Sequence, residues 1–185
     1  MQEYIYTVRS IVVKVTLLFL IVGLTPYAQA AALPSVAVFD FEMINSSLQP
    51  MTPAEAARLK NLGETLRKKL GESGLVQVVD TGPVNEAALE SNLQNCGGCD
   101  TDLAKKVGAQ LSITGTVQKV SDLILNENIY LRDAVSGKML AVMSADMRGD
   151  TDQSWSRTLD WLIRYRLIPD LKLYDANPGL YDGSN

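Results

Sequence analysis

The feature that most constrains the fold is an apolar stretch followed by a strongly signalled helix. Residues 36–41, VAVFDF, are almost continuously apolar, which is typical of a strand covered on both faces. Thr52, Pro53 and Glu55 then supply an N-cap, a proline in the first helical turn and the glutamate of a capping box. A second apolar run over residues 75–80 completes a strand–helix–strand unit. This order predicts a parallel pair of strands with a right-handed crossover.

The hydrophobic period changes in the second half of the chain. Residues 83–93 and 103–107 predict two short helices. From residue 111 onward apolar and polar residues alternate, and the runs 111–118, 123–133 and 138–148 predict an antiparallel three-strand meander. The fold class that follows is α/β (α+β): a mixed sheet with a strand–helix–strand opening, a meander and packed helices.

A last helix follows the meander. Residues 149–151 provide its cap, and Pro169 is expected to end it. Helical spacing places one set of large apolar side chains on the side facing the sheet: Trp155, Leu159, Leu162 and Ile163.

The amino-terminal end resembles a bacterial secretory leader. Arg9 and Lys14 precede an apolar run over residues 15–24, and residues 28–30, Ala-Gln-Ala, form a cleavage site for signal peptidase. The apolar run is shorter than the roughly 20 residues that a membrane-spanning helix needs. We therefore expect a signal peptide over residues 1–30, a periplasmic location and no stable membrane anchor after cleavage.

The length that remains fits one domain. We expect a single α/β periplasmic domain over residues 34–168 and a flexible C-terminal tail over residues 169–185. The full chain has a net charge of −4, and removal of the leader makes it −5. This sign argues against nucleic acid as a partner. The chain has no histidine, which excludes Ser-His-Asp and Cys-His catalysis and imidazole-based zinc sites. No cofactor is indicated.

The two cysteines, Cys96 and Cys99, are separated by two glycines. In an exported protein this spacing predicts a local structural disulfide. The alternative is a redox-active pair, because the start of a helix at Asp100 would favour a thiolate. Asp100 and Asp102 oppose that reading, since their negative charge raises the pKa of a nearby thiol.

Three carboxylates follow the two parallel strands. Asp40 and Glu42 end the first strand, and Asp80 ends the second, so the three are expected to gather at one edge of the sheet. Oxygen ligands suit a hard cation such as calcium or a lanthanide, although the spacing lacks the ladder of an EF-hand loop. The alternative is that these side chains cap turns and stay hydrated.

Two residue patterns within the meander are expected to be structural. The methionines at positions 139, 143 and 147 are spaced too widely along a strand to share one copper ion, so they are predicted to fill the core. Glu127 falls in phase with apolar neighbours, and a strand end or bulge is expected to move it out of the core.

The last helix also carries a candidate partner surface. Trp161 and Tyr165 are four residues apart on a face adjoining the buried one, with Arg157 and Arg164 nearby. Aromatic and arginine residues are enriched at binding hot spots, so these four predict contact with a protein partner. The alternative is that Trp161 fills a second part of the core.

Several segments resemble an uncharacterised family of secreted bacterial proteins, defined only as a domain of unknown function. The similarity covers residues 36–167, and QKVSDLILN and RGDTDQSWSR are its most specific parts. Genes of that family often lie beside genes for quinoprotein (PQQ-dependent) alcohol dehydrogenases and their transport and cytochrome accessories. The resemblance therefore implies an accessory role in alcohol-oxidising or methylotrophic metabolism. It implies no active site.

The strand–helix–strand opening and the hairpin around DAVSGK are more distantly similar to the amino-terminal domain of TolB and to CsgG-type periplasmic proteins. Those relatives imply a binding and assembly fold, although the lipid-anchoring cysteine of the CsgG type is missing. The leading hypothesis is a non-catalytic periplasmic accessory or binding protein. The alternatives are a thiol–disulfide redox protein using Cys96 and Cys99, and a cation-binding protein using the carboxylate edge.

Overall fold

The computed structural model describes residues 32–176, so the predicted signal peptide over residues 1–30 lies outside the described residues. One sheet of five strands runs through the unit that begins at Leu33, in the order β2-β1-β3-β4-β5. The strands are β1 (Ser35–Asn45), β2 (Gln77–Val78), β3 (Leu111–Ser121), β4 (Ile124–Asp133) and β5 (Met139–Arg148). The helices are α2 (Pro53–Ser73), α3 (Asn85–Glu90), α4 (Cys99–Lys106), α5 (Asp152–Leu162) and α6 (Ile168–Ala176), with a short 3-10 turn at Gly82–Val84 and a π-helical turn at Ile163–Leu167.

The predicted fold class is confirmed. β1 runs parallel to β2 on one side and to β3 on the other, and β3, β4 and β5 form the predicted antiparallel meander. β2 is shorter than the predicted run, because only Gln77 and Val78 pair with β1. Both faces of the sheet are covered near β1, which explains the continuous apolar run in that strand.

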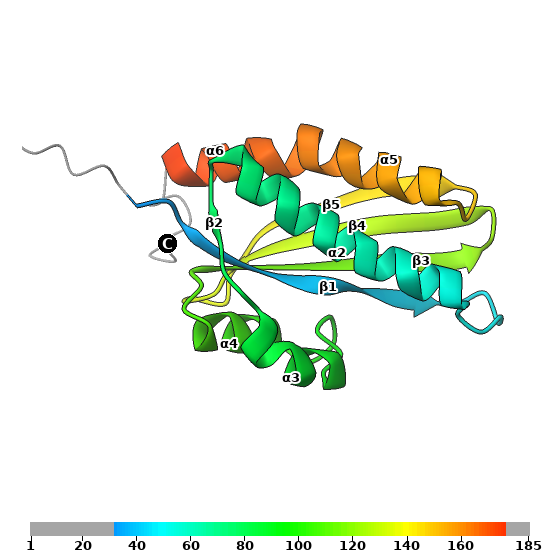
Figure 1. Cartoon of the computed structure of the whole chain (residues 1–185), viewed down its shortest axis with the longest axis horizontal. Helices are drawn as coiled ribbons and strands as arrows, with labels where there is room; N and C mark the ends of the chain where they lie inside the picture. Colours follow the sequence, from blue (N-terminus) through cyan, green and yellow to red (C-terminus); the bar gives the residue numbers. More distant parts are fainter. Residues whose placement is uncertain (1–31, 177–185) are drawn as a thin grey trace, which may run out of the picture. The chain divides into compact units, whose positions relative to one another are not determined.

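Helices cover the two faces unequally, as Figure 1 shows. α2, α5 and α6 lie on one face, over the larger core, whose members include Val38, Leu66 and Trp155. α3 and α4 lie on the opposite face and cover a smaller core around Phe39 and Leu103. The two layers of helix explain why four consecutive residues of β1, 36–39, are buried.

The start of α2 follows from its sequence. The side chain of Thr52 accepts a hydrogen bond from the backbone N–H of Glu55, and the Glu55 carboxylate accepts one from the backbone N–H of Thr52. This is the predicted capping box. Within the helix Gly63 lies against Asp40 of β1 so closely that a Cβ at this position would collide with the Asp40 carboxylate. The glycine therefore lets α2 approach the sheet.

The last helical region differs from the prediction, because Pro169 does not end it. α5 continues through the π-helical turn, in which the backbone N–H of Ile168 donates to the carbonyl of Ile163, and then into α6. Pro169 lies in the first turn of α6, where a missing N–H is tolerated. Leu171 is buried, so the part of the expected tail up to Ala176 packs on the core as helix. Residues 177–185 lie outside the described residues.

Candidate partner-binding surface

The inner face of α5 holds the helix on the sheet. Trp155, Leu159, Leu162 and Ile163 are all buried, as predicted from their spacing. The side chain of Thr151 caps the helix by accepting a hydrogen bond from the N–H of Ser154. Trp155 is fixed further by an indole hydrogen bond of 2.9 Å to the carboxylate of Asp150.

The four residues predicted to meet a partner lie on the outer face of α5 and of the π-helical turn that continues it. Trp161 is 45% exposed and Tyr165 is 56% exposed, and their ring centres are 5.8 Å apart. Arg157 and Arg164 line one cavity with both rings, and this cavity has a volume of about 270 Å³. The structure therefore brings Arg157, Trp161, Arg164 and Tyr165 together; we call them the aromatic–arginine surface. Trp161 is not enclosed in a second part of the core.

A second cavity adjoins this surface. It has a volume of about 400 Å³ and lies between α5 and the edge strand β5. Arg157, Thr158 and Trp161 line it from the helix, and residues 144–146 line it from the strand. Arg157 and Trp161 thus contribute to both cavities, which links the exposed face of the helix to the edge of the sheet.

The positive charges of the aromatic–arginine surface are not neutralised by acidic side chains among the described residues of the domain. Asp160, the acidic residue of this helix face, forms an ion pair of 2.9 Å with Lys69 of α2. Within residues 32–176 neither Arg157 nor Arg164 forms an ion pair or a side-chain hydrogen bond. Two unpaired guanidinium groups beside two exposed rings favour contact with an acidic partner.

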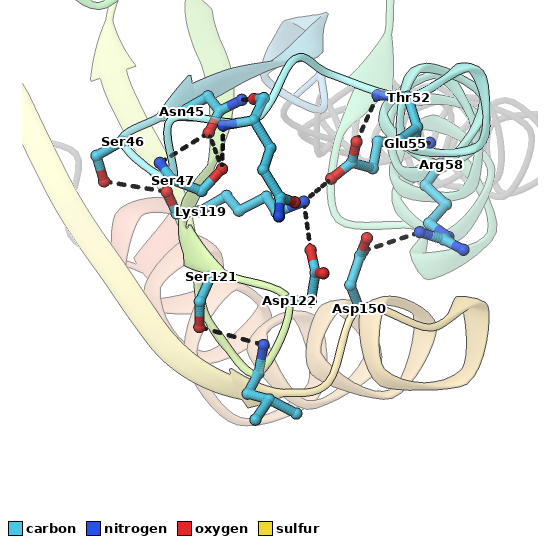
Figure 2. A network of polar contacts seen from close by, with 12 residues as sticks. Asn45, Ser46, Ser47, Thr52, Glu55, Arg58, Lys119, Ser121, Asp122 and Asp150 are labelled. Carbon is cyan, nitrogen blue, oxygen red and sulfur yellow. Dashed lines mark hydrogen bonds and ion pairs between the residues drawn. The ribbon is translucent and has the colours of Figure 1, made fainter.

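A buried ion cluster joins the start of α2 to the end of β3 (Figure 2). Lys119, near the end of β3, lies 2.7 Å from the carboxylate of Glu55 and 2.7 Å from that of Asp122. Burial raises the pKa of Glu55, but the hydrogen bonds from Lys119 and Thr52 outweigh it and lower that pKa to about 2. Hydrogen bonds to Asp122 and Glu55 raise the pKa of Lys119. Both groups are therefore charged at neutral pH.

A second ion pair attaches α5 to α2 directly. The guanidinium of Arg58 donates to Asp150 at 2.8 Å and to Asp152 at 2.6 Å, and it lies 5.8 Å from the ring centre of Trp155. Figure 2 shows Arg58 and Asp150 side by side. The hydrogen bond to Asp152 is the main cause of the raised pKa of Arg58. Sequence reasoning identified neither cluster, because each joins residues that are far apart in the chain.

The two cysteines are joined as a disulfide, with their Cα atoms 5.7 Å apart. The bridge closes the loop before α4, whose first residue is Cys99. Asp100 turns away from the sulfur atoms: its carboxylate accepts a hydrogen bond of 2.9 Å from the Ser112 hydroxyl and lies 3.7 Å from Arg132. The buried side chain of Asp100 therefore connects α4 to the sheet.

The three carboxylates predicted at one sheet edge do not form a cluster. Asp40 pairs with Arg67 of α2, whereas Glu42 accepts a hydrogen bond from the backbone N–H of Leu93, a member of the smaller core. Asp80 accepts a hydrogen bond from the N–H of Gly82 and closes a turn. Within residues 32–176 no group of three acidic or cysteine side chains is placed to hold a metal ion. The alternative reading, that these carboxylates cap turns, describes Asp80 alone, because Asp40 and Glu42 contact residues far away in the sequence.

Glu127 is an acidic residue buried among the apolar side chains of the larger core. It was expected to leave the core at a strand end or bulge, but it lies in the regular part of β4 and is fully buried. Neither carboxylate oxygen has a hydrogen-bond partner in the described part of the chain. Burial raises the pKa of Glu127 well above its usual value, and the nearby charge of Asp160 adds to this effect. Met143 and Met147 are buried in the same core, as predicted, but Met139 is only partly buried and does not belong to it.

No helix among the described residues is both long and apolar enough to cross a membrane. The family model DUF3280, described as "Protein of unknown function (DUF2380)", matches residues 34–167. No curated protein matches the chain in sequence.

Solved structures of similar fold include the C-terminal domain of LpoB from Salmonella enterica, with 15% identity and a TM-score of 0.47 over 65% of this chain and 87% of that one. The C-terminal domain of LpoB from Escherichia coli has 19% identity and a TM-score of 0.43 over 64% and 86% of the two chains. TolB from Acinetobacter baumannii has 14% identity and a TM-score of 0.43 over 71% of this chain and 28% of that one. TolB is thus among the solved structures that the chain matches, and the likeness to CsgG-type proteins stays a prediction.

Proposed function

We propose that this chain, which belongs to the DUF3280 family, is a non-catalytic accessory protein that binds a protein partner through the aromatic–arginine surface. The observation that carries the proposal is the exposed pair Trp161 and Tyr165, held 5.8 Å apart on a helix whose opposite face is buried. A helix fixed in this way presents its rings at little cost in conformational entropy. Such preorganised aromatic residues are typical of binding hot spots.

The chemistry of the surface supports a partner that is acidic where it makes contact. Arg157 and Arg164 flank the rings and have no acidic neighbour paired with them in the described residues. An arginine buried against a partner carboxylate gains paired hydrogen bonds that water-exposed arginine lacks. We infer that the partner presents one or more carboxylates together with an apolar group that packs against the exposed faces of the rings.

The compartment and the biological setting are part of the same proposal. The predicted signal peptide over residues 1–30 supports a periplasmic location for the predicted domain over residues 34–168. The family resemblance supports a role beside a quinoprotein alcohol dehydrogenase or its transport system. We therefore propose that the partner is a protein of that system.

The test is site-specific photocrosslinking in the native bacterium. A photoreactive amino acid replaces Tyr165 in the exported full-length protein, and the crosslinked partner is identified by mass spectrometry. We expect one dominant partner, acidic at the crosslinked site, and loss of that crosslink when Trp161→Ala and Arg157→Ala are added. The absence of any crosslinked protein would contradict the binding function. A partner unrelated to alcohol oxidation would contradict only the proposed setting.

The matched control changes exposed apolar residues on other parts of the domain. Leu89 and Leu123 are each more exposed than Trp161. The double variant Leu89→Ala/Leu123→Ala should leave the crosslink unchanged. Equal loss of the crosslink in both variants would show that it reports non-specific binding and not a defined site.

A further inference from the structure

The outer edge of β5 lies beside the aromatic–arginine surface and is open. β5 is the last strand of the sheet, and no strand within residues 32–176 pairs with its outer side. It spans ten residues, and its first seven, Met139–Ala145, include no charge and no proline. Natural edge strands are usually blunted by lysine, proline or short length, because an open edge is a template for another strand.

The groove between this edge and α5 is shaped for an added strand. It is lined by Ser144, Ala145 and Asp146 on the strand side and by Arg157 and Trp161 on the helix side. A strand added to β5 would lie about 4.8 Å beyond it. Every second side chain of that strand would then point to the face of the sheet on which α5 lies, toward Trp161 and Arg157.

The charges at this edge define the chemistry of the added strand. Arg157 and Arg164 have no ion pair in the described residues, and neither does Arg148 at the end of β5. Of the acidic residues nearby, Asp160 pairs with Lys69, whereas Asp146 accepts a hydrogen bond from Asn126 and forms no ion pair in the described residues. Within residues 32–176 the arginines at this edge without an ion pair, Arg148, Arg157 and Arg164, therefore outnumber the one unpaired carboxylate, on a chain whose net charge is −4. Charge complementarity favours an acidic segment.

A second copy of this chain fits the edge less well. A two-fold dimer formed through β5 would place the aromatic–arginine surface of one protomer close to the same surface of the other. Arg157 and Arg164 would then meet like charges, which disfavours association. The occupant that the charges select is an acidic segment of another protein.

We infer that an extended, acidic segment of a partner protein adds to the outer edge of β5 as a sixth strand, with alternate side chains in the groove beneath Arg157 and Trp161. This inference rests on the proposed binding function and specifies how binding occurs. Backbone hydrogen bonds to β5 supply affinity, and the groove supplies selectivity for carboxylates.

The probe for this inference is a ten-residue peptide of alternating glutamate and threonine, compared with a peptide in which lysine replaces glutamate. Amide hydrogen exchange of residues 139–148 is followed by NMR in the mature protein. We expect the acidic peptide to slow exchange at every second amide of β5, those whose N–H groups point outward, and to shift the indole resonance of Trp161. The lysine peptide should do neither.

A charge-reversal variant tests the role of the groove. Arg157→Glu should weaken binding of the acidic peptide about tenfold or more. Lys60→Glu, on the exposed side of α2, changes the net charge equally and should leave binding unchanged.

Four results would overturn the added strand: no binding of the acidic peptide at millimolar concentration, binding without alternating protection, equal binding of the lysine peptide, or a dimer in which β5 is already protected. If the crosslinking experiment still captures a partner through Tyr165, the binding function stands and only the strand geometry is wrong.

Discussion

The ammonium group of Lys119 lies 2.7 Å from the carboxylate of Glu55, and both side chains are buried although 64 residues separate them in the chain. Glu55 serves two purposes at once, because one of its carboxylate oxygens completes the capping box of α2 and the other meets the ammonium group. The start of α2 is therefore attached to the end of β3. Breaking one member of such a pair leaves the other charge without compensation.

Replacement of Lys119 by methionine should lower the free energy of unfolding by about 3 kcal/mol. The estimate is at the low end for buried pairs because Asp122, the third member of the cluster, is largely exposed. Urea denaturation measures the effect. Lys68→Met removes an exposed i,i+4 pair with Glu72 and should change stability by less than about 0.5 kcal/mol. Equal effects of the two substitutions would contradict the role assigned to the buried pair.

Glu127 should make the protein less stable as pH rises. Its pKa is raised in the folded state, so the unfolded chain ionises first as pH increases above about 4.5. The stability contributed by the neutral carboxyl is fully present below that pH and is lost as pH rises through the folded pKa. Glu127→Leu should remove this loss and raise the free energy of unfolding at pH 8 by about 1–3 kcal/mol. Thermal unfolding as a function of pH measures it.

The control for Glu127 is Glu90→Leu, at an exposed position on α3. This variant should keep the pH dependence of the native protein. A Glu127→Leu protein whose stability curve still parallels that of the native chain would show that another group causes the loss.

Gly115 should resist substitution because the ring of Phe41 occupies the place of a side chain. A Cβ at position 115 would overlap three atoms of that ring, whereas a Cβ at Gly71 of α2 meets no atom within 4 Å. Gly115→Ala should therefore cost about 1–3 kcal/mol of stability, and Gly71→Ala should gain about 0.5–1 kcal/mol. The two melting temperatures should move in opposite directions. An unchanged melting temperature of the Gly115→Ala variant would mean that β1 and β3 can move apart at little cost in stability.

The disulfide should contribute little to global stability. It closes a loop with only Gly97 and Gly98 between the cysteines, and chain-entropy arguments then give less than about 2 kcal/mol. The double variant Cys96→Ser/Cys99→Ser should fold and keep its partner. The reduction potential of the native bridge should lie below about −300 mV, as for other structural disulfides. A potential well above this value, with loss of function and unchanged stability in the variant, would favour the redox alternative.

Local patterns predicted most of the fold because they depend on neighbours in the sequence. The capping box at Thr52 fixed the start of α2, and the alternating runs fixed the meander. The end of the last helix was wrong for a physical reason: the π-helical turn shifts the hydrogen-bond pattern before Pro169, so the proline begins a new helical segment instead of ending the old one.

The candidate sites were predicted less well where they depend on how neighbouring strands are aligned. In a regular strand Asp40 and Glu42 would point to the same face of the sheet. The pairing of β1 with β3 shifts between Val38 and Phe41, however. Asp40 therefore contacts α2, whereas Glu42 contacts the backbone at Leu93. Lys119 was missed because a charged residue in a strand gives no sign of a distant partner. The aromatic–arginine surface was found because its members lie within nine residues of one helix.

The parallel pairing of β1 with β3 has a consequence for how the chain acquires its fold. The first pair of residues that joins the two strands is Val36 with Leu111. About 75 further residues must therefore be synthesised before β1 can pair with β3. During synthesis β1 lacks this partner, and β2 pairs with only two of its residues. Folding of this kind is slow and exposes a surface prone to aggregation. The protein should therefore depend on a holding chaperone until the meander has been synthesised.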